Sequence, residues 1–135
     1  MAFYPDTGTF CEVMTDLFER AMARPETGLA IRQVGLVFRL VTTDPEAVLT
    51  VDGRAQPPQF TSAPPAGPAD LVLRLPADLL HQIWLGEVRL RDAFFGGQVQ
   101  VEGPMLRALG LANLFRQVEA LYPQVLRERG LIPAA

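Results

Sequence analysis

Residues 69–103 read ADLVLRLPADLLHQIWLGEVRLRDAFFGGQVQVEG, and the spacing of their apolar side chains decides the class of fold. Every second residue over 70–75 is a leucine, which predicts a strand with one apolar face. Pro76 suits the first turn of a helix that the glycine at 86 is expected to end. The apolar side of this helix consists of Leu79, Leu80, Ile83 and Trp84.

The residues that follow predict a short helix, a last strand and a longer apolar helix. The short helix runs through 93–95 and stops at two glycines, after which residues 99–101 alternate between apolar and polar. Pro104 opens a helix with too many apolar residues for one face, and Gly110 lowers its local stability and marks a bend. A closing apolar segment starts at Pro123.

The N-terminal part predicts one amphipathic helix. Thr9 and Glu12 have the spacing of a capping box at its start, and Pro25 and Gly28 are expected to stop it. Its apolar face consists of Phe10, Val13, Met14, Leu17, Phe18, Ala21 and Met22.

Between these helical regions the alternation of side chains predicts three further strands. Residues 34–41 form the first, 43–46 a turn and 47–51 the second. The pair at 52–53 is Asp-Gly, which favours a tight hairpin turn with positive φ. The return strand over Arg54 to Thr61 contains two prolines and should therefore lie at the sheet edge. About five strands, mostly antiparallel, with helices at both ends of the chain predict an α+β fold.

Composition bounds the function. The 135 residues make a single domain, 1–135, with 49% hydrophobic residues and a mean hydropathy of +0.17. A net charge of −3 gives no basic footprint for nucleic acid, and no apolar run is long enough for an integral membrane segment. We therefore expect a soluble, cytoplasmic protein that binds an apolar molecule.

The side chains available for catalysis are few. His81 has no second histidine or cysteine at ligand spacing, so no metal is expected. Ser62 lies in a proline-rich loop, Cys11 is the only cysteine, and nothing pairs the scattered carboxylates for acid–base chemistry. We expect no cofactor and no enzyme. A hydrolase or transferase built on His81 or Ser62 remains a third alternative.

Residues 69–115 resemble the sterol-carrier-protein domain family. Gly86 with the block Asp92 to Gly97 looks like the family's "G-x-x … A-F-x-x-G" pattern, and Val99 to Gly103 looks like its closing strand. The order of the upstream elements also fits, so the resemblance covers roughly residues 10–120. The family often has lysine after the second glycine and aspartate after the last one. This chain has Gln98 and Pro104 there, which puts a headgroup role at either position in doubt.

The resemblance implies a twisted five-stranded, mostly antiparallel sheet with helices packed on one face, enclosing an apolar tunnel. In the family the tunnel takes fatty acids, acyl-CoA, phospholipids or sterols. The residues that would line it here are Phe10, Met14, Leu36, Phe38, Leu40, Leu80, Trp84, Phe94, Phe95, Val101, Met105, Leu109 and Phe115.

The leading functional hypothesis is thus non-enzymatic binding and carrying of a lipid. The alternative is an accessory interaction module, which presents a hydrophobic intermediate or docks a partner enzyme. That hypothesis rests on the C-terminal segment from Pro123, where Leu131 and Ile132 are expected to be exposed to a protein partner.

Overall fold

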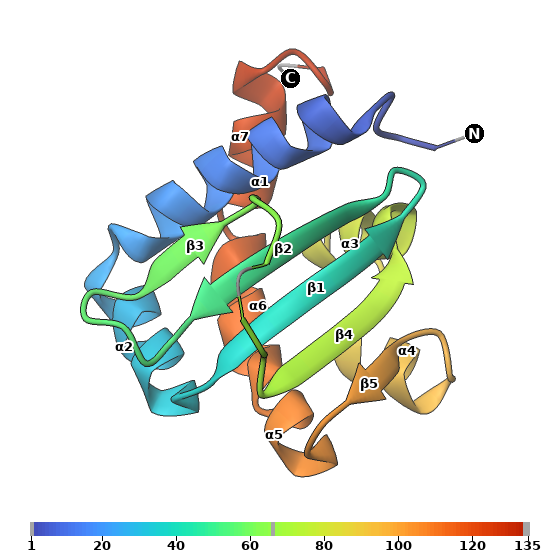
Figure 1. The fold of residues 1–135 in the computed structure, drawn as a ribbon. Coiled ribbons are helices and arrows are strands. Elements are labelled where there is room, and N and C mark those ends of the chain that lie inside the picture. Colours follow the sequence, from blue (N-terminus) through green and yellow to red (C-terminus); the bar gives the residue numbers. More distant parts are fainter. Residues whose placement is uncertain (1, 66, 134–135) are drawn as a thin grey trace.

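The computed structural model describes residues 2–65 and 67–133, and these contain a five-stranded sheet (Figure 1). The strands are β1 (Val37–Thr43), β2 (Ala47–Asp52), β3 (Gln59–Thr61), β4 (Leu71–Pro76) and β5 (Gln100–Glu102). Their order across the sheet is β3-β2-β1-β4-β5. β1 and β4 are parallel, and the three other pairs are antiparallel. The predicted α+β fold with a mostly antiparallel sheet is confirmed.

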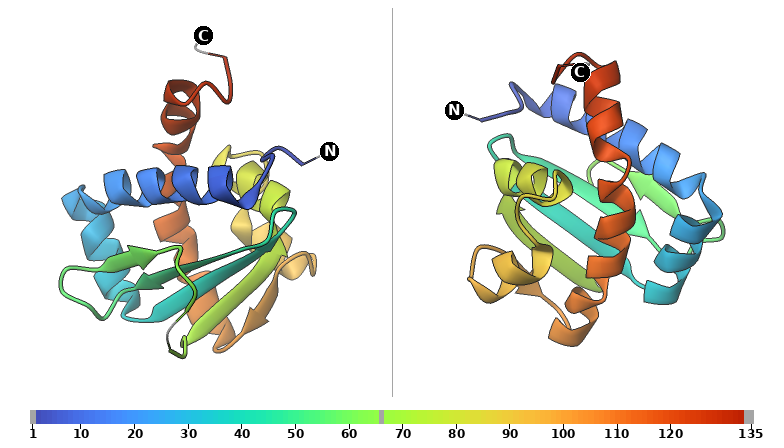
Figure 2. Two further views of the ribbon diagram at one scale, coloured as in Figure 1. Left: turned by 45° about the horizontal axis from the view of Figure 1, so that its top comes forward. Right: turned by 180° about the vertical axis from the view of Figure 1, so that it is seen from behind.

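Seven helices accompany the sheet in the described part of the chain. They are α1 (Thr7–Met22), α2 (Pro25–Val34), α3 (Ala77–Trp84), α4 (Leu90–Phe95), α5 (Met105–Leu109), α6 (Leu111–Glu119) and α7 (Tyr122–Glu128). Seen from behind, the helices lie over one face of the sheet, with α6 across its middle (Figure 2). Within residues 2–65 and 67–133 there is no helix with the length and apolar character needed to cross a membrane.

The alternation of side chains along the strands explains why one face is covered. Phe38 and Leu40 of β1 and their partners Leu71 and Leu73 of β4 point to the same side and are buried beneath the helices. The other side of β1 is half-buried, because only the loop between β3 and β4 crosses it (Figure 1). Arg39 on that side donates a hydrogen bond to the carbonyl of Gly67, at 2.8 Å.

The start of α1 differs from the predicted capping box. Asp6 is the N-cap, and its carboxylate accepts a hydrogen bond from the amide of Thr9 at 2.6 Å. This hydrogen bond lowers the pKa of Asp6. Thr9 itself lies inside the helix, so its pairing with Glu12 as a capping box was wrong.

The prediction that Pro25 and Gly28 end the first helix was also wrong. α1 ends at Met22, and Pro25 begins α2, in which Gly28 is an interior residue. Proline fits the first helical position because its missing N–H has no intrahelical partner there. α2 continues to Val34, so β1 starts at Val37 rather than at 34.

The connection from β2 to β3 is longer than the predicted tight hairpin. Only Gln59–Thr61 pair with β2, although they do form the sheet edge, as the two prolines indicated. Gly53 does not have the positive φ that was predicted. It is required for another reason, because a Cβ there would lie 2.8 Å from the carbonyl oxygens of Ile31 and Leu36.

Candidate functional site

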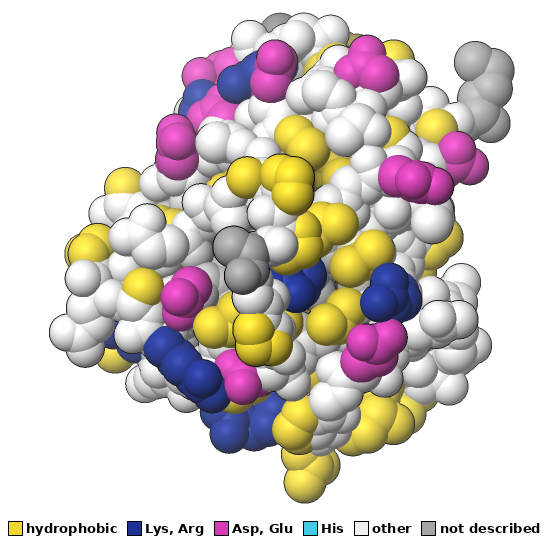
Figure 3. Space-filling view, viewed as in Figure 1, with side chains coloured by type: hydrophobic (Ala, Val, Ile, Leu, Met, Phe, Trp, Pro, Cys, Tyr) yellow, Lys and Arg dark blue, Asp and Glu magenta, His cyan; other side chains and the backbone are white. Residues whose placement is uncertain are grey.

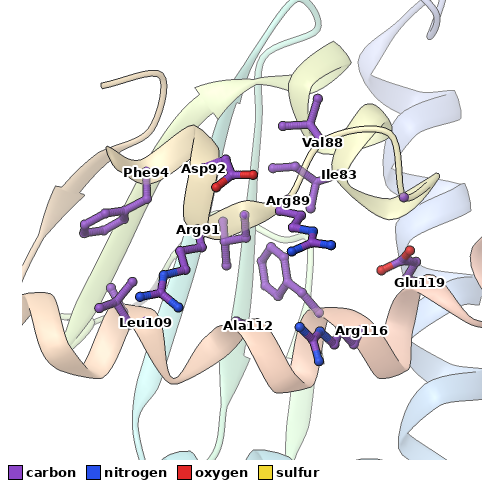
Figure 4. A pocket seen from close by; sticks show the side chains of 14 residues that line it. Ile83, Val88, Arg89, Arg91, Asp92, Phe94, Leu109, Ala112, Arg116 and Glu119 are labelled. Atoms are coloured by element: carbon purple, nitrogen blue, oxygen red, sulfur yellow. The ribbon is translucent and has the colours of Figure 1, made fainter. Parts of the chain in front are cut away.

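A cavity of about 660 Å³ lies between two pairs of helices, α3 and α4 on one side and α5 and α6 on the other (Figure 4). Its size falls within the range of small-molecule sites, roughly 300–1,000 Å³. The lining residues come from the end of α3 and the loop after it, from α4, and from α5 and α6. None of the described strand residues contributes to it.

The inner wall of the cavity is apolar. It is formed by Ile83, Val88, Leu90, Phe94, Ala108, Leu109, Ala112 and Phe115. Gly110 separates α5 from α6, at the position where the sequence predicted a bend, and residues of both helices line the cavity together with α4. Such a wall suits an apolar chain and offers few groups that could hold a polar substrate in one orientation.

Arginine dominates the polar part of the lining. Figure 4 shows Arg89 and Arg91 extending toward α6, where Arg116 lies opposite Arg89. The carboxylates of Asp92 and Glu119 also line the cavity. Five arginines elsewhere form ion pairs within 4.0 Å: Arg20, Arg24, Arg54, Arg74 and Arg129.

The three cavity arginines differ from these. Among the described residues, Arg89, Arg91 and Arg116 have no carboxylate within 4.0 Å. Exposed guanidinium groups without an internal partner remain available to an external anion. The cavity therefore combines an apolar wall with a rim that can bind negative charge.

The residues predicted to line a tunnel fall into three groups. Phe94, Leu109 and Phe115 line the cavity. A second group does not line the cavity and is buried in the core: Phe10, Met14, Leu36, Phe38, Leu40, Leu80 and Trp84. Val101 is half-buried, whereas Phe95 and Met105 are exposed. A tunnel enclosed between sheet and helices stays a prediction.

Trp84 does not line the cavity but packs against Phe115, which does. Its ring is fully buried, and its centroid is 5.5 Å from that of Phe115. The indole N–H has no acceptor within the described structure, although such a group usually finds one when buried. Trp84 therefore contacts the wall rather than the cavity itself.

Sequence reasoning missed Arg116, Ala112 and Glu119 as lining residues. All three lie on α6, which the sequence presented only as a strongly apolar helix. Their direction depends on how α6 crosses α4, a tertiary relationship that helical periodicity does not contain.

The candidate catalytic residues have separate partners. Nδ1 of His81 lies 2.7 Å from the hydroxyl of Tyr122. Ser62 lies beside Cys11 in a second, polar hollow, and burial raises the pKa of the Cys11 thiol. The structure thus gives no support to a pairing of His81 with Ser62 for nucleophilic catalysis.

Comparison with known proteins assigns the fold to a family. The sequence matches none of the curated proteins compared with it. Several solved structures are similar, among them the apo form of sterol carrier protein 2 from Yarrowia lipolytica. Its TM-score is 0.64 and its identity 18%, over 84% of this chain and 94% of that one.

Two further structures share the fold. The sterol carrier protein domain 2 of Helicoverpa armigera has a TM-score of 0.64 and 20% identity, over 81% of this chain and 87% of that one. The ubiquinone synthesis protein UbiJ-SCP2 has a TM-score of 0.58 and 18% identity, over 78% and 87%. At the level of sequence, a model of the SCP-2 sterol transfer family matches residues 15–116, from within α1 to within α6. Since that match covers most of its length, the chain belongs to the SCP-2 sterol transfer family.

Proposed function

We propose that this protein binds and carries a lipid whose apolar chain occupies the cavity between α3–α4 and α5–α6. Membership of the SCP-2 sterol transfer family indicates lipid binding or transfer, and domains of this family are generally non-catalytic carriers. The observation that carries the proposal is the cavity itself, with its apolar wall and its three arginines, which form no ion pair with any described residue.

The expected affinity follows from the apolar surface that the cavity can cover. Burial of about ten methylene groups contributes roughly 8 kcal/mol, at about 0.8 kcal/mol each. The loss of translational and rotational freedom on association offsets a large part of this gain. Dissociation constants nearer micromolar than picomolar are expected, which allows a carrier to release its cargo.

The arginines favour a cargo with an anionic headgroup. The charged residues of the lining are Arg89, Arg91 and Arg116 together with Asp92 and Glu119, which leaves one net positive charge. Charge-assisted hydrogen bonds from guanidinium groups to a carboxylate or phosphate are among the stronger ones in proteins. A fatty acid or a phosphate-bearing lipid therefore fits this rim better than an uncharged sterol does.

Blocking the cavity tests the proposal. In an Ala112→Trp variant the indole would occupy the space of at least two methylenes, so binding should weaken by at least about tenfold. Asn113→Trp is the matched control, because Asn113 is the exposed neighbour on α6 and does not line the cavity. Isothermal titration calorimetry with a long-chain fatty acid measures both variants, and circular dichroism checks that they fold.

Two outcomes would contradict the proposal. Equal affinity of the Ala112→Trp and Asn113→Trp variants would place the cargo outside this cavity. Solvent extraction of the natively purified protein followed by mass spectrometry identifies any bound lipid. Absence of both a co-purified lipid and binding to any long-chain species would end the carrier hypothesis.

The accessory-module alternative was based on exposed apolar residues near the C-terminus, and the structure does not show them exposed. Leu131 and Ile132 are half-buried and pack against the protein's own core, so they are not the exposed residues that were expected. A protein partner bound through this segment stays a prediction.

A further inference from the structure

Three large apolar side chains protrude from the end of the molecule where α4 and α5 lie. Phe95 at the end of α4 is 66% exposed, and Met105 and Leu106 at the start of α5 are 59% and 82% exposed. Hydrophobic side chains gather at this lower edge of the molecule in Figure 3. We refer to Phe95, Met105 and Leu106 as the α4–α5 tip. Grouped exposure of large apolar side chains marks an interaction surface more often than an isolated exposed residue does.

The tip adjoins residues that line the cavity. Phe95 follows Phe94, which lines the cavity, and its ring packs edge-on against that of Phe94 at 5.6 Å. Met105 and Leu106 stand on the same short helix as Ala108 and Leu109, which also line the cavity. Whatever covers the tip therefore also lies next to the cavity.

Two arginines lie beside the tip. The guanidinium carbon of Arg91 lies 5.8 Å from the centroid of the Phe95 ring. Arg107 is the residue after Leu106, and its guanidinium donates a hydrogen bond to the carbonyl of Val34 at the end of α2. The charged residues of this end are the arginines 74, 89, 91, 107 and 116 and the carboxylates Glu87, Asp92, Glu102 and Glu119, of which Arg74 and Glu102 form an ion pair. This end therefore carries a net charge of about +1, whereas the whole chain carries −3.

We propose that the α4–α5 tip docks on an anionic lipid bilayer, with the cavity mouth facing the membrane. Protruding phenylalanine, methionine and leucine side chains enter the boundary between headgroups and acyl chains, while arginines contact the phosphates. The negative remainder of the protein is repelled by the same surface, so the charge distribution orients the molecule. This inference rests on the proposed lipid cargo. In this orientation an acyl chain can move between bilayer and cavity without crossing water.

Vesicle binding tests the docking surface. Wild-type protein should float with vesicles of phosphatidylcholine containing about one quarter phosphatidylglycerol, and less with phosphatidylcholine alone or at high salt. A Phe95→Ser/Leu106→Ser variant removes two exposed apolar side chains, so its partition coefficient should fall by at least about tenfold. Leu29→Ser is the matched control, because Leu29 is also a large exposed apolar residue, 49% exposed, but lies on α2.

A reporter at the tip adds a measurement of depth. In a Phe95→Trp variant, emission should shift to the blue on vesicle binding and be quenched by brominated phospholipid, whereas a Leu29→Trp variant should show neither effect. The docking proposal is overturned if the mixed vesicles do not bind the wild-type protein, or if Leu29→Ser lowers binding as much as the tip variant does.

Docking and cargo binding can fail separately. The tip residues do not line the cavity, so the Phe95→Ser/Leu106→Ser variant should bind monomeric fatty acid as the wild type does. The Ala112→Trp variant should still bind vesicles. If the tip variant loses fatty-acid binding and vesicle binding together, the tip is part of the cargo site and not a docking surface.

Discussion

The hydroxyl of Tyr122 on α7 lies 2.7 Å from Nδ1 of His81 on α3, and the same hydroxyl is hydrogen-bonded to that of Tyr4. Burial raises the pKa of both tyrosines, so both hydroxyls keep their protons. The ring of Phe3 stacks on His81 with centroids 3.8 Å apart. This chain of polar groups joins the N-terminal residues, α3 and α7 within otherwise apolar packing.

Tyr122→Phe removes the middle hydroxyl of this chain. The buried Tyr4 hydroxyl and the His81 nitrogen each lose a partner, which should lower the free energy of unfolding by about 1–3 kcal/mol. Urea unfolding at neutral pH measures the loss. In the Tyr4→Phe/Tyr122→Phe double variant the loss should be smaller than the sum of the single losses. Additive losses would mean that the two hydroxyls do not stabilise one another.

The stability should depend on pH through His81. Burial lowers the pKa of His81, and the opposing charges of Asp78 and Glu87 do not cancel this effect. The folded state therefore binds the proton less readily than the unfolded state, whose histidine pKa is about 6.5. His81 therefore does not lower the free energy of unfolding above about pH 6.5. As the pH falls from there to the lowered native pKa, protonation of the unfolded state progressively lowers that free energy. Urea unfolding across this range measures it.

Two controls apply to this pH dependence. A His81→Gln variant should have a flatter profile over the same range, whatever its absolute stability. Since His81 is the only histidine, its proton NMR titration reads the native pKa directly. A value at or above 6.5 would contradict the prediction.

Arg116→Gln should weaken binding of an anionic cargo selectively. The lost interaction is exposed and partly screened, so about 1 kcal/mol, or roughly fivefold in affinity, is expected for a fatty acid. A fatty alcohol of the same chain length should bind the variant and the wild type equally. Arg32→Gln, an exposed arginine on α2 away from the cavity, serves as the control. An equal loss for acid and alcohol would indicate damage to the apolar wall instead.

Trp84 should report on occupancy of the cavity without contacting the cargo. The adjacent Phe115 separates it from the cavity, so its emission maximum should change little. Energy transfer to a conjugated polyene fatty acid should nevertheless quench the emission saturably. A non-absorbing fatty acid in excess should restore it. Unchanged emission during independently measured saturable binding would place the cargo away from Phe115.

Asp16 should hold α7 against α1. Its carboxylate accepts hydrogen bonds from Nε of Arg20 at 2.7 Å and from Nε of Arg129 at 3.0 Å. Partial burial alone would raise the pKa of Asp16, but the two arginines hold it below its usual value. This contribution to stability is present above about pH 4 and is lost as the pH falls through the lowered native pKa.

Asp16→Asn tests the contact between the two helices. The expected loss of stability is about 1 kcal/mol or less, because the groups are close to solvent. Amide hydrogen exchange should increase over α7, and high salt should have a similar effect on the wild type. Asp44→Asn in the β1–β2 turn is the control. Unchanged exchange over α7 would show that apolar packing alone holds this helix.

Local patterning predicted those parts of the fold that depend on side-chain alternation. The leucines of β4 and the short helix ended by the glycines at 96 and 97 are where the sequence indicated. Pro25 was misinterpreted because a proline can either stop one helix or begin the next. α2 buries only Thr27, Ala30 and Ile31, so its apolar face is too short to have predicted a helix.

Features set by contacts between distant segments could not be predicted in this way. Gly53 is needed because the carbonyls of Ile31 and Leu36 approach it, and neither is near it in the sequence. The cavity depends similarly on the crossing of α6 and α4, which turns Arg116 toward Arg89. Single-sequence periodicity identifies the apolar side of each helix but not the helix that it meets.

The parallel pairing of β1 with β4 has a consequence for the order of folding. Phe38 pairs with Val51, 13 positions further along, but with Leu71 only after 33 positions. Closing the longer loop costs more entropy, so we expect amides of β1 and β2 to gain protection before those of β4 in pulsed hydrogen exchange. Every residue that lines the cavity follows β4 in the chain. A cargo that needs the finished cavity would then stabilise the part of the molecule that forms last, slowing unfolding without accelerating folding.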